Sequence, residues 1–333
     1  MSDLRKIAAD LIHKSAFMAL AGIIVINILS VDSLKASPDS TGISLAYPVY
    51  SQYLQNGLVV NPAYTGTRGA LSTFLSYRKQ WLGMDAPGPE MQSASLHAPF
   101  KNDKVALGFL AQFMQYGFTN TTSIYGSYAY HIRMANGRLS FGLKGGVDIS
   151  KSDFSDIRTI KPDDVFTTND DPYVMPNVGA GVYYSSDRLF GGLSIPQFMS
   201  YRKTSANKVQ AYHSFSDYDI IFSGGGLVTF SDFLKFKPSV LLQYSLDKAE
   251  KIKQFDINGN FILADVIWLG GSWRTNEEVV VGILQFQINP QFMLGFSYDY
   301  PVGRMSSYSN GSVEFALRYE FGSKVSAANP RYF

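Results

Sequence analysis

Apolar and polar residues alternate along residues 138–150, which read RLSFGLKGGVDIS. Side chains of an extended chain point alternately to its two faces, so a period of two predicts a β-strand with two unlike faces. Lys144 and Asp148 belong to the polar face, together with serine and glycine. The apolar face consists of Leu139, Phe141, Leu143, Gly145, Val147 and Ile149. What lies against each face decides the class of fold.

The same alternation recurs along the chain and predicts about fourteen strands of about ten residues each between residues 68 and 322. The clearest are 105–113, 138–150, 177–185, 236–245, 255–263 and 312–321. Less regular patterns predict strands at roughly 69–82, 90–98, 120–132, 187–195, 219–229, 266–275, 279–288 and 291–300. Turn-rich pieces such as MANGR, SSDR and INPQ separate the strands.

Two architectures could use such strands. A soluble sandwich buries the apolar face in a core, whereas a transmembrane barrel turns it towards lipid and keeps the polar face in the lumen. Strand length, aromatic residues at strand ends and a polar face rich in glycine and serine favour the barrel. We therefore predict an all-β fold, a transmembrane antiparallel β-barrel of about 14 strands of the bacterial outer-membrane type. The apolar face of residues 139–149 would then contact lipid, and Lys144 and Asp148 would point into the lumen. A secreted β-sandwich is the alternative.

The composition is consistent with little water-facing surface. Of 333 residues, 17% are charged, 46% are hydrophobic and 14% are aromatic, whereas soluble domains have about 25% charged residues. The net charge of +2 indicates neither a nucleic acid nor an acidic partner. Because the chain contains no cysteine, disulfides, thiol chemistry and a lipoprotein anchor are excluded.

The first residues resemble a secretory signal. Basic residues precede an apolar run at 18–31, which is shorter than the roughly 20 residues of a membrane-spanning helix but suits a signal-peptide core. An uncleaved membrane anchor is the alternative to cleavage near Ala36. The predicted organisation is a signal peptide at 1–36, an N-terminal segment at 37–67 that is periplasmic or plugs the lumen, an outer-membrane β-barrel at 68–322, and a C-terminal tail at 323–333.

Catalytic patterns are nearly absent beyond the predicted signal. His97 and His131 lie within strand patterns, where a hydrogen-bonded wall histidine is expected, and His213 is the third. No G-x-S-x-G, H-E-x-x-H or Walker pattern occurs. A phospholipase with a Ser–His pair across strands is the alternative. We predict no enzymatic activity and no cofactor.

Two connections, 151–174 and 196–218, are long and polar, which makes them candidate external loops because bacterial barrels have short periplasmic turns. Four carboxylates in the first loop could bind calcium, but their spacing matches no known calcium repeat, and solvated side chains are the simpler interpretation. These carboxylates are Asp163, Asp164, Asp170 and Asp171.

The most specific pattern lies at residues 50–99: an S-Q-Y segment, an N-P-A-Y-x-G turn, and a strand ending R-x-Q-W followed by glycine and A-P. In this pattern the chain resembles the PorP/SprF family of type IX secretion system membrane proteins. LFGGLSIPQFM at 189–199 and NPRYF at 329–333 also resemble that family, whereas LAYPVY replaces its usual Q-D-P. The motif residues are Ser51, Gln52, Tyr53, Asn61, Pro62, Ala63, Tyr64, Gly66, Arg78, Gln80, Trp81, Gly83 and Pro87.

The resemblance implies an outer-membrane β-barrel that acts by protein–protein recognition. Members of the family are needed for secretion or cell-surface attachment of cargo proteins with type IX C-terminal signal domains, gliding adhesins among them. Others work with core secretion components, including periplasmic peptidoglycan-binding partners. Cargo could be held by β-augmentation or by loop contacts. The expected partners are such cargo, these components and outer-membrane lipid, and no nucleic acid.

The motif also has a physical interpretation. Pro62 and Gly66 favour a tight reversal that leads into the first strand. Arg78 falls on the inner face of that strand, where a buried guanidinium needs a partner. The candidate partners are Asp148, Glu314 and Glu320. A structural role in closing the barrel is the alternative to a partner-binding role.

The main rival to a recognition protein is a porin or small-solute transporter, because a barrel of this size can be open or filled. Large apolar residues on the predicted inner face favour a filled lumen. These residues are Phe74, Leu110, Met114, Leu241, Ile262 and Trp268. The aromatic residues of segment 40–67 are candidates for part of that filling.

Overall fold

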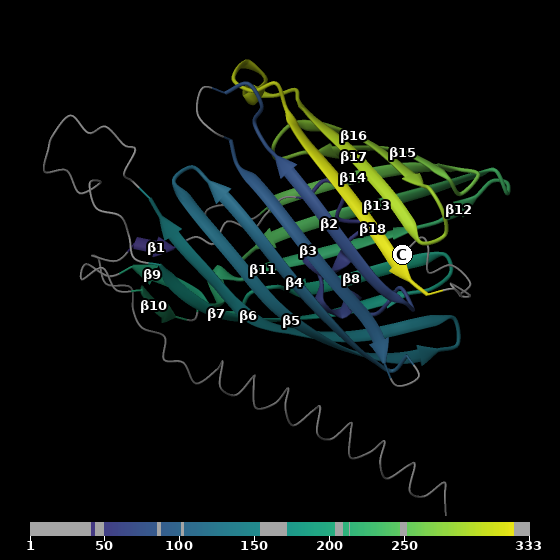
Figure 1. Cartoon of the computed structure of the whole chain (residues 1–333), viewed down its shortest axis with the longest axis horizontal. Coiled ribbons are helices and arrows are strands. Elements are labelled where there is room, and N and C mark those ends of the chain that lie inside the picture. The colour runs from purple at the N-terminus through teal and green to yellow at the C-terminus, as the bar shows by residue number, and fades with distance from the viewer. Residues whose placement is uncertain are drawn as a thin grey trace, which may run out of the picture.

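A computed structural model describes residues 41–43, 50–84, 88–100, 103–153, 172–203, 209–212, 214–246 and 252–322. Fourteen antiparallel strands close into one barrel, in which neighbours along the chain pair and the last strand pairs with the first (Figure 1). The strands are β2 (Leu71–Lys79), β3 (Glu90–Phe100), β4 (Val105–Tyr116), β5 (Thr119–Met134), β6 (Gly137–Ser152), β7 (Tyr173–Ser185), β8 (Leu189–Ile195), β11 (Asp219–Gly226), β13 (Leu234–Ser245), β14 (Ile252–Leu263), β15 (Ile267–Arg274), β16 (Val279–Gln287), β17 (Phe292–Pro301) and β18 (Ser312–Phe321).

The predicted fold class is confirmed, because each strand of the closed barrel falls where the alternation places it. The strand ends differ in places. β2 is shorter than the predicted 69–82, and β7 begins before the predicted 177. β5 and β6 run for 16 residues each and exceed the predicted 120–132 and 138–150. Their extra residues are mostly polar or glycine, so the hydrophobic pattern gives no sign of them, although backbone pairing continues.

The pattern did not predict the shortest elements. Within the predicted loop 196–218, β9 (Ser200–Lys203) pairs with β10 (Val209–Tyr212) and with β1 (Thr41–Ile43) to form a separate three-stranded sheet. The two-residue strand β12 (Val228–Thr229) extends the pairing of β13. Single turns of 3-10 helix are present at η1 (Gly57–Val59), η2 (Pro62–Tyr64), η4 (Phe215–Asp217) and η5 (Arg304–Ser307). Segments of two to four residues are too short to show a period.

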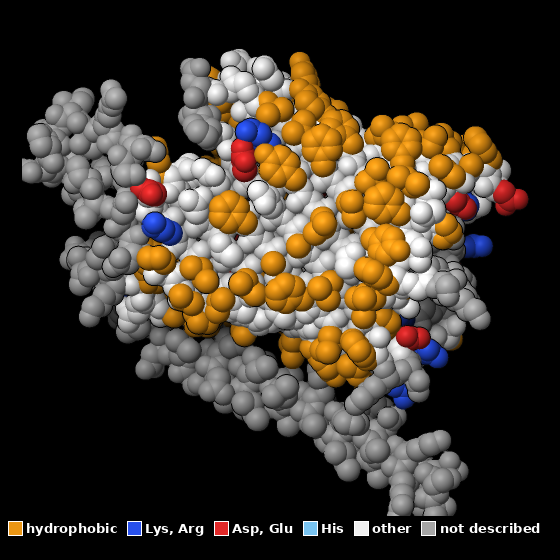
Figure 2. Space-filling model, viewed as in Figure 1, with side chains coloured by type: hydrophobic (Ala, Val, Ile, Leu, Met, Phe, Trp, Pro, Cys, Tyr) orange, Lys and Arg blue, Asp and Glu red, His pale blue; other side chains and the backbone are white. Residues whose placement is uncertain are grey.

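The two faces of the wall differ in the way that the alternation predicts. Leu75 is 51% exposed on the outside, whereas its neighbours Phe74 and Ser76 are buried inside. Figure 2 shows apolar side chains spread over the outer wall, with charged side chains near its ends. Because the outer face is apolar over most of its length, lipid and not water suits it. On β6, Asp148 is buried on the inner face, as predicted.

Closure of the barrel satisfies the strand backbone within the protein, which a hydrocarbon environment requires. The β11–β13 pairing completes the ring that the β18–β2 pairing begins. Within the described residues, no helix has the length and hydrophobicity needed to cross a bilayer.

The two ends of the barrel differ in their connections. At one end, which we call the short-turn end, β5 joins β6 through residues 135–136, β7 joins β8 through 186–188, and β18 ends at Phe321. At the opposite, long-loop end lie the connections 80–89, 153–172, 196–218 and 302–311. In bacterial barrels short turns face the periplasm and long loops face outward, which gives the orientation.

Exposed aromatic side chains are found near both ends of the wall, as expected where strands cross the membrane interfaces. Near the long-loop end they are Tyr116, Phe118, Tyr300 and Tyr308, and near the short-turn end Phe100, Phe230, Phe233 and Phe321. The predicted signal peptide at 1–36 and tail at 323–333 lie outside the described residues, so these boundaries stay predictions.

Candidate functional site

Residues 50–68, which we call the lumen segment, lie inside the barrel. All of them are buried except Leu54 and Gly57, which are half-buried. The segment forms hydrogen bonds to inner-face groups of strands on several sides of the wall. Its partners there include Arg78, Ser95, His97, Ser127, Arg138, Val182, Ser194, Asn258, Arg274, Asp299, Glu314 and Glu320.

Two apolar clusters join the lumen segment to the wall. Leu58 and Tyr64 pack with Ile262 and Trp268, and Val60 packs with the second cluster. The six inner-face residues that the sequence indicated all point inward. Phe74 is buried, and Leu110, Met114, Leu241, Ile262 and Trp268 belong to or pack against the two clusters. The interior is therefore packed like a core.

A network of buried charges holds the start of the lumen segment near the long-loop end. Arg78 contacts Asp299 at 2.6 Å and Glu314 at 3.2 Å. Arg274 contacts Asp299 at 3.1 Å and Asp256 at 3.2 Å. All five side chains are buried, so each charge depends on its partners for stabilisation.

Ser51 joins the lumen segment to this network. Its hydroxyl donates to Asp299 at 2.8 Å and accepts from Arg78 at 2.9 Å, and its amide donates to Glu314 at 2.9 Å. Gln52 donates to the Glu314 carbonyl at 3.2 Å. The predicted Arg78–Glu314 pair is confirmed, whereas the main partner, Asp299, was not predicted.

The other two predicted partners of Arg78 have different roles. Asp148 accepts hydrogen bonds from Ser123 and Tyr125 on β5. Glu320 accepts from Arg68, the last residue of the lumen segment, at 2.6 Å. Of the three alternatives that the sequence offered, Glu314 is therefore the one that reaches Arg78, because the strand order of the closed barrel decides which carboxylate meets which guanidinium.

The N-P-A-Y-x-G motif fixes the middle of the lumen segment against glycines of the wall. Asn61 caps η2, accepting from the Ala63 amide at 2.9 Å and donating to the Val182 carbonyl at 2.9 Å. A Cβ on Gly142 would lie 2.2 Å from the Ala63 nitrogen. The absence of a side chain at Gly142 therefore allows the backbone of η2 to lie directly on β6.

Gly66, at the end of the motif, also packs closely against the barrel wall. Gly66 has φ +75°, and a Cβ there would lie 2.2 Å from Ala106. Its amide donates to Nδ1 of His97 at 3.0 Å. Tyr64 packs edge-on against His97, with ring centroids 5.6 Å apart. His97 is thus a hydrogen-bonded wall histidine, as predicted.

His131 forms a Ser–His pair, because its Nδ1 lies 2.7 Å from the Ser140 hydroxyl. Both side chains are buried, and Nε2 of His131 lies directly under Gly66. No acyl substrate could reach the Ser140 hydroxyl without displacing the lumen segment, so the pair suits a structural hydrogen bond and not nucleophilic catalysis.

The remaining motif residues lie at the long-loop end. Gln80 and Trp81 line a cleft of about 460 Å³, which we call the outer cleft. Trp81 has φ +56° and donates its amide to the Ser312 hydroxyl at 3.3 Å. Gly83, with φ +82°, lies against Asn310 of the facing loop. Pro87 lies outside the described residues.

The outer cleft combines aromatic, apolar and acidic groups. Beyond Gln80 and Trp81 its lining includes Asn276, Glu277, Glu278, Val279, Asp299, Pro301, Met305, Ser309, Gly311 and Ser312. The Glu277 side chain is 40% exposed and contacts Arg274 at 3.2 Å, so the cleft continues into the buried network. Such a surface can bind a protein segment with an apolar anchor and a basic side chain.

The small sheet of β1, β9 and β10 lies beside this end. The guanidinium of Arg202 is 5.4 Å from the centre of the Tyr212 ring. Burial and the neighbouring Asp217 raise the pKa of the Tyr212 phenol to about 12, so it stays protonated at neutral pH. The sequence does not indicate this sheet, because strands of three or four residues are too short to show a period.

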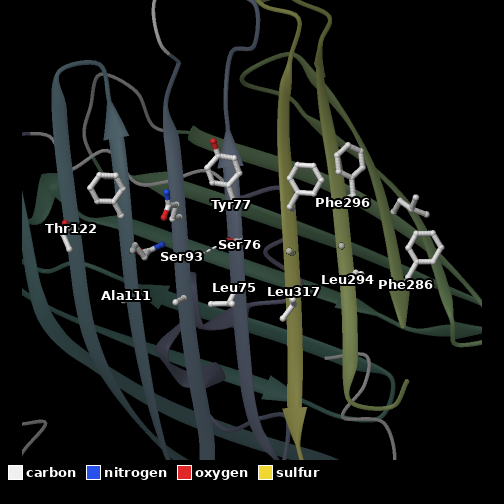
Figure 3. Close-up of a pocket in the computed structure, with 18 residues that line it drawn as sticks. Leu75, Ser76, Tyr77, Ser93, Ala111, Thr122, Phe286, Leu294, Phe296 and Leu317 are labelled. Carbon is white, nitrogen blue, oxygen red and sulfur yellow. Dashed lines mark hydrogen bonds between the residues drawn. The ribbon is translucent and has the colours of Figure 1, made fainter. Parts of the chain in front are cut away.

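A broad apolar concavity of about 870 Å³ lies on the outside of the wall over β2, β3, β18 and their neighbours. Figure 3 shows its lining, including Leu75, Phe296 and Leu317, with the Ser76–Ser93 hydrogen bond of 2.7 Å as a dashed line. It lies on the lipid-facing surface and contains no cluster of titratable groups.

No group of side chains among the described residues could hold a metal ion. The four aspartates considered for calcium and His213 lie outside the described residues, so the calcium hypothesis is untested. Of the thirteen predicted motif residues, the structure places eight in the lumen segment, Arg78 in the network beside it, Gln80 and Trp81 at the outer cleft, and Gly83 against Asn310.

The profile of the family described as type IX secretion system membrane protein PorP/SprF matches residues 43–319. No curated protein matches the chain. Similar solved structures include the CymD monoaromatic hydrocarbon channel, with 11% identity and a TM-score of 0.45 over 84% of this chain and 95% of that one. The Acinetobacter baumannii outer membrane protein Omp33 has 8% identity and a TM-score of 0.42 over 76% and 98%. The KdgM porin in complex with disordered oligogalacturonate has 10% identity and a TM-score of 0.35 over 75% and 99%.

Proposed function

This chain belongs to the PorP/SprF family of type IX secretion system membrane proteins, and from that premise we propose that it recognises cargo at its long-loop end. The chain is an outer-membrane component of type IX secretion. Membership of this family implies contact with the secretion machinery or with cargo. The proposed cargo is a secreted protein with a C-terminal signal domain. The proposed mode of action is binding, without an enzymatic step or cofactor.

The observation that carries this proposal is the packed lumen. A solute channel needs a continuous water-filled path, but the lumen segment occupies the interior with apolar clusters and paired charges. The internal cavity beside Tyr53 and Lys237 has a volume of about 20 Å³, which is room for about one water molecule. A porin function, the main rival, has no comparable support.

The outer cleft supports placement of the binding site at the long-loop end. Trp81 offers an aromatic anchor point, and Glu277 and Glu278 offer charge at the rim. Trp81 and Glu278 both have positive φ, at +56° and +51°, a backbone conformation that costs free energy and clusters at functional sites. A loop or strand of the cargo domain would bind across this cleft.

Binding of a purified type IX C-terminal signal domain to the detergent-solubilised full chain tests the proposal. We expect Trp81→Ala to weaken binding by at least about tenfold, since aromatic hot spots contribute about 2 kcal/mol or more. The control is Tyr308→Ala, because Tyr308 is 69% exposed at the same end but does not line the cleft. Equal affinities of Trp81→Ala and the unmodified chain would contradict the proposal, as would failure of the unmodified chain to bind.

A further inference from the structure

The lumen segment has a direction. Near its start, Ser51 contacts Arg78, Asp299 and Glu314, which lie near the strand ends at the long-loop end. Its last contact, from Arg68, is to Glu320, one residue from the end of β18 at the short-turn end. The chain therefore passes once along the lumen before β2 begins.

Between these two ends the lumen segment is compact. Val60 lies in one apolar cluster with Tyr50 and Tyr53, and its carbonyl accepts from Ser194 at 2.5 Å. Gly66 follows, bonded to His97 towards the short-turn end of β3. The segment turns on itself within the lumen, but its net course runs from the long-loop end at Ser51 to the short-turn end at Arg68.

The described strand that precedes the lumen segment in the sequence, β1, lies at the long-loop end. Thr41 to Ile43 pair with Tyr201 to Lys203 of β9, in the connection between β8 and β11. That connection is held at this end, because Asn177 near the start of β7 bonds to Phe198 and Met199 at 3.1 Å each. Figure 1 shows β1, β9 and β10 together, well away from the arrowhead of β18.

We propose that the chain enters its own barrel from outside the cell, so that β1 is a cell-surface element. Fourteen strands return the chain to the side on which β2 begins. The single passage of the lumen segment then puts the two ends of the described chain on opposite faces of the membrane. With long loops outward, β1 lies outside and Phe321 lies at the periplasmic face.

This placement separates the two ends of the molecule. The sheet of β1, β9 and β10 faces the outside of the cell, whereas periplasmic components can reach only the short-turn end. The inference depends on the topology and on the orientation of the loops. It does not rest on cargo binding, so it can fail or hold independently of the proposed function.

The chain is suited to a labelling test because none of its 333 residues is cysteine. Single-cysteine variants Thr41→Cys, Tyr308→Cys and Ala135→Cys report on β1, the long-loop end and the short-turn end respectively. A membrane-impermeant maleimide on intact cells should label Thr41→Cys and Tyr308→Cys. Ala135→Cys should be labelled only after the outer membrane is permeabilised.

The opposite result for β1 would overturn the inference: protection of Thr41→Cys in intact cells, with labelling only after permeabilisation, as for Ala135→Cys. A site-specific protease sequence inserted after Ser40 gives a second readout if the cysteine is shielded by pairing. Cleavage by protease added to intact cells is expected. Cleavage only in permeabilised cells would place the segment in the periplasm and contradict the inference.

Discussion

Arg78 and Lys79 are neighbours in the sequence with opposite surroundings. Arg78 points into the lumen and contacts Asp299, Glu314 and the Ser51 hydroxyl within a buried network. Lys79 points outward and pairs with Glu90 at 2.5 Å, with both side chains partly exposed. A positive charge on the inner face of β2 therefore depends on buried partners, whereas one on the outer face belongs to a partly exposed ion pair.

Replacing these two residues separates the buried and the exposed interaction. We expect Arg78→Ala to lower the free energy of unfolding by about 3–5 kcal/mol, because Asp299 and Glu314 lose a buried partner. Lys79→Ala, the matched control, should cost about 1 kcal/mol or less. Urea unfolding of the detergent-solubilised variants, followed by the gel-mobility shift of the folded barrel, measures both. Equal costs would contradict the assignment of Arg78 to a buried network.

The sequence indicated Arg78 as a buried residue but only part of its network. The alternation in β2 places Arg78 and Phe74 on one face, and this needs only local information. Asp299 and Arg274 come from β17 and β15, which are more than 190 residues away, and their approach depends on barrel closure. The Ser51 contacts depend in addition on the path of the lumen segment, which no period describes.

At the scale of the element, strand β6 has one face that contacts the lumen segment and one face that points towards lipid. Gly142 faces inward beneath η2, where a Cβ would overlap the Ala63 backbone. Gly145 faces outward, where the nearest heavy atom to an added Cβ is Val178 at 3.8 Å. Both are glycines in one strand, yet only Gly142 is required by packing.

Substitution of each glycine by valine tests the register of β6. Gly142→Val should cost about 1–3 kcal/mol or prevent folding, because overpacking displaces η2. Gly145→Val should be tolerated, since an added apolar side chain faces lipid. The yield of heat-modifiable folded barrel in outer-membrane fractions, compared between the two variants, gives the answer. Loss of the folded barrel in Gly145→Val, with normal yield of Gly142→Val, would contradict the assignment of the two faces.

Strands could be predicted from the sequence because the apolar period persists wherever lipid covers one face. The alternation located β6 and β18 without any knowledge of their partners. It failed at β1, β9 and β10, which are three or four residues long and lie beyond the apolar wall. The outer cleft was not predicted as a site because it joins residues of three connections and three strands, although the motif had indicated Gln80 and Trp81.

At the scale of the whole molecule, the barrel and the lumen segment form one packed unit. The wall supplies serine, glycine and paired charges on its inner face, and the segment supplies the complementary Asn61, Tyr64 and Arg68. Outward residues interact with lipid, and the long-loop end carries the cleft and the small sheet. Solute conduction and this packing are incompatible, and that is the central claim.

Single-channel recording of the purified chain in a planar lipid bilayer tests this claim most directly. We predict no stable conductance for the unmodified protein, because residues 50–68 fill the lumen. A variant lacking residues 50–64 should conduct, which also shows that the barrel inserts. Steady conductance steps from the unmodified protein, equal in size to those of the deletion variant, would contradict a filled lumen and favour a porin.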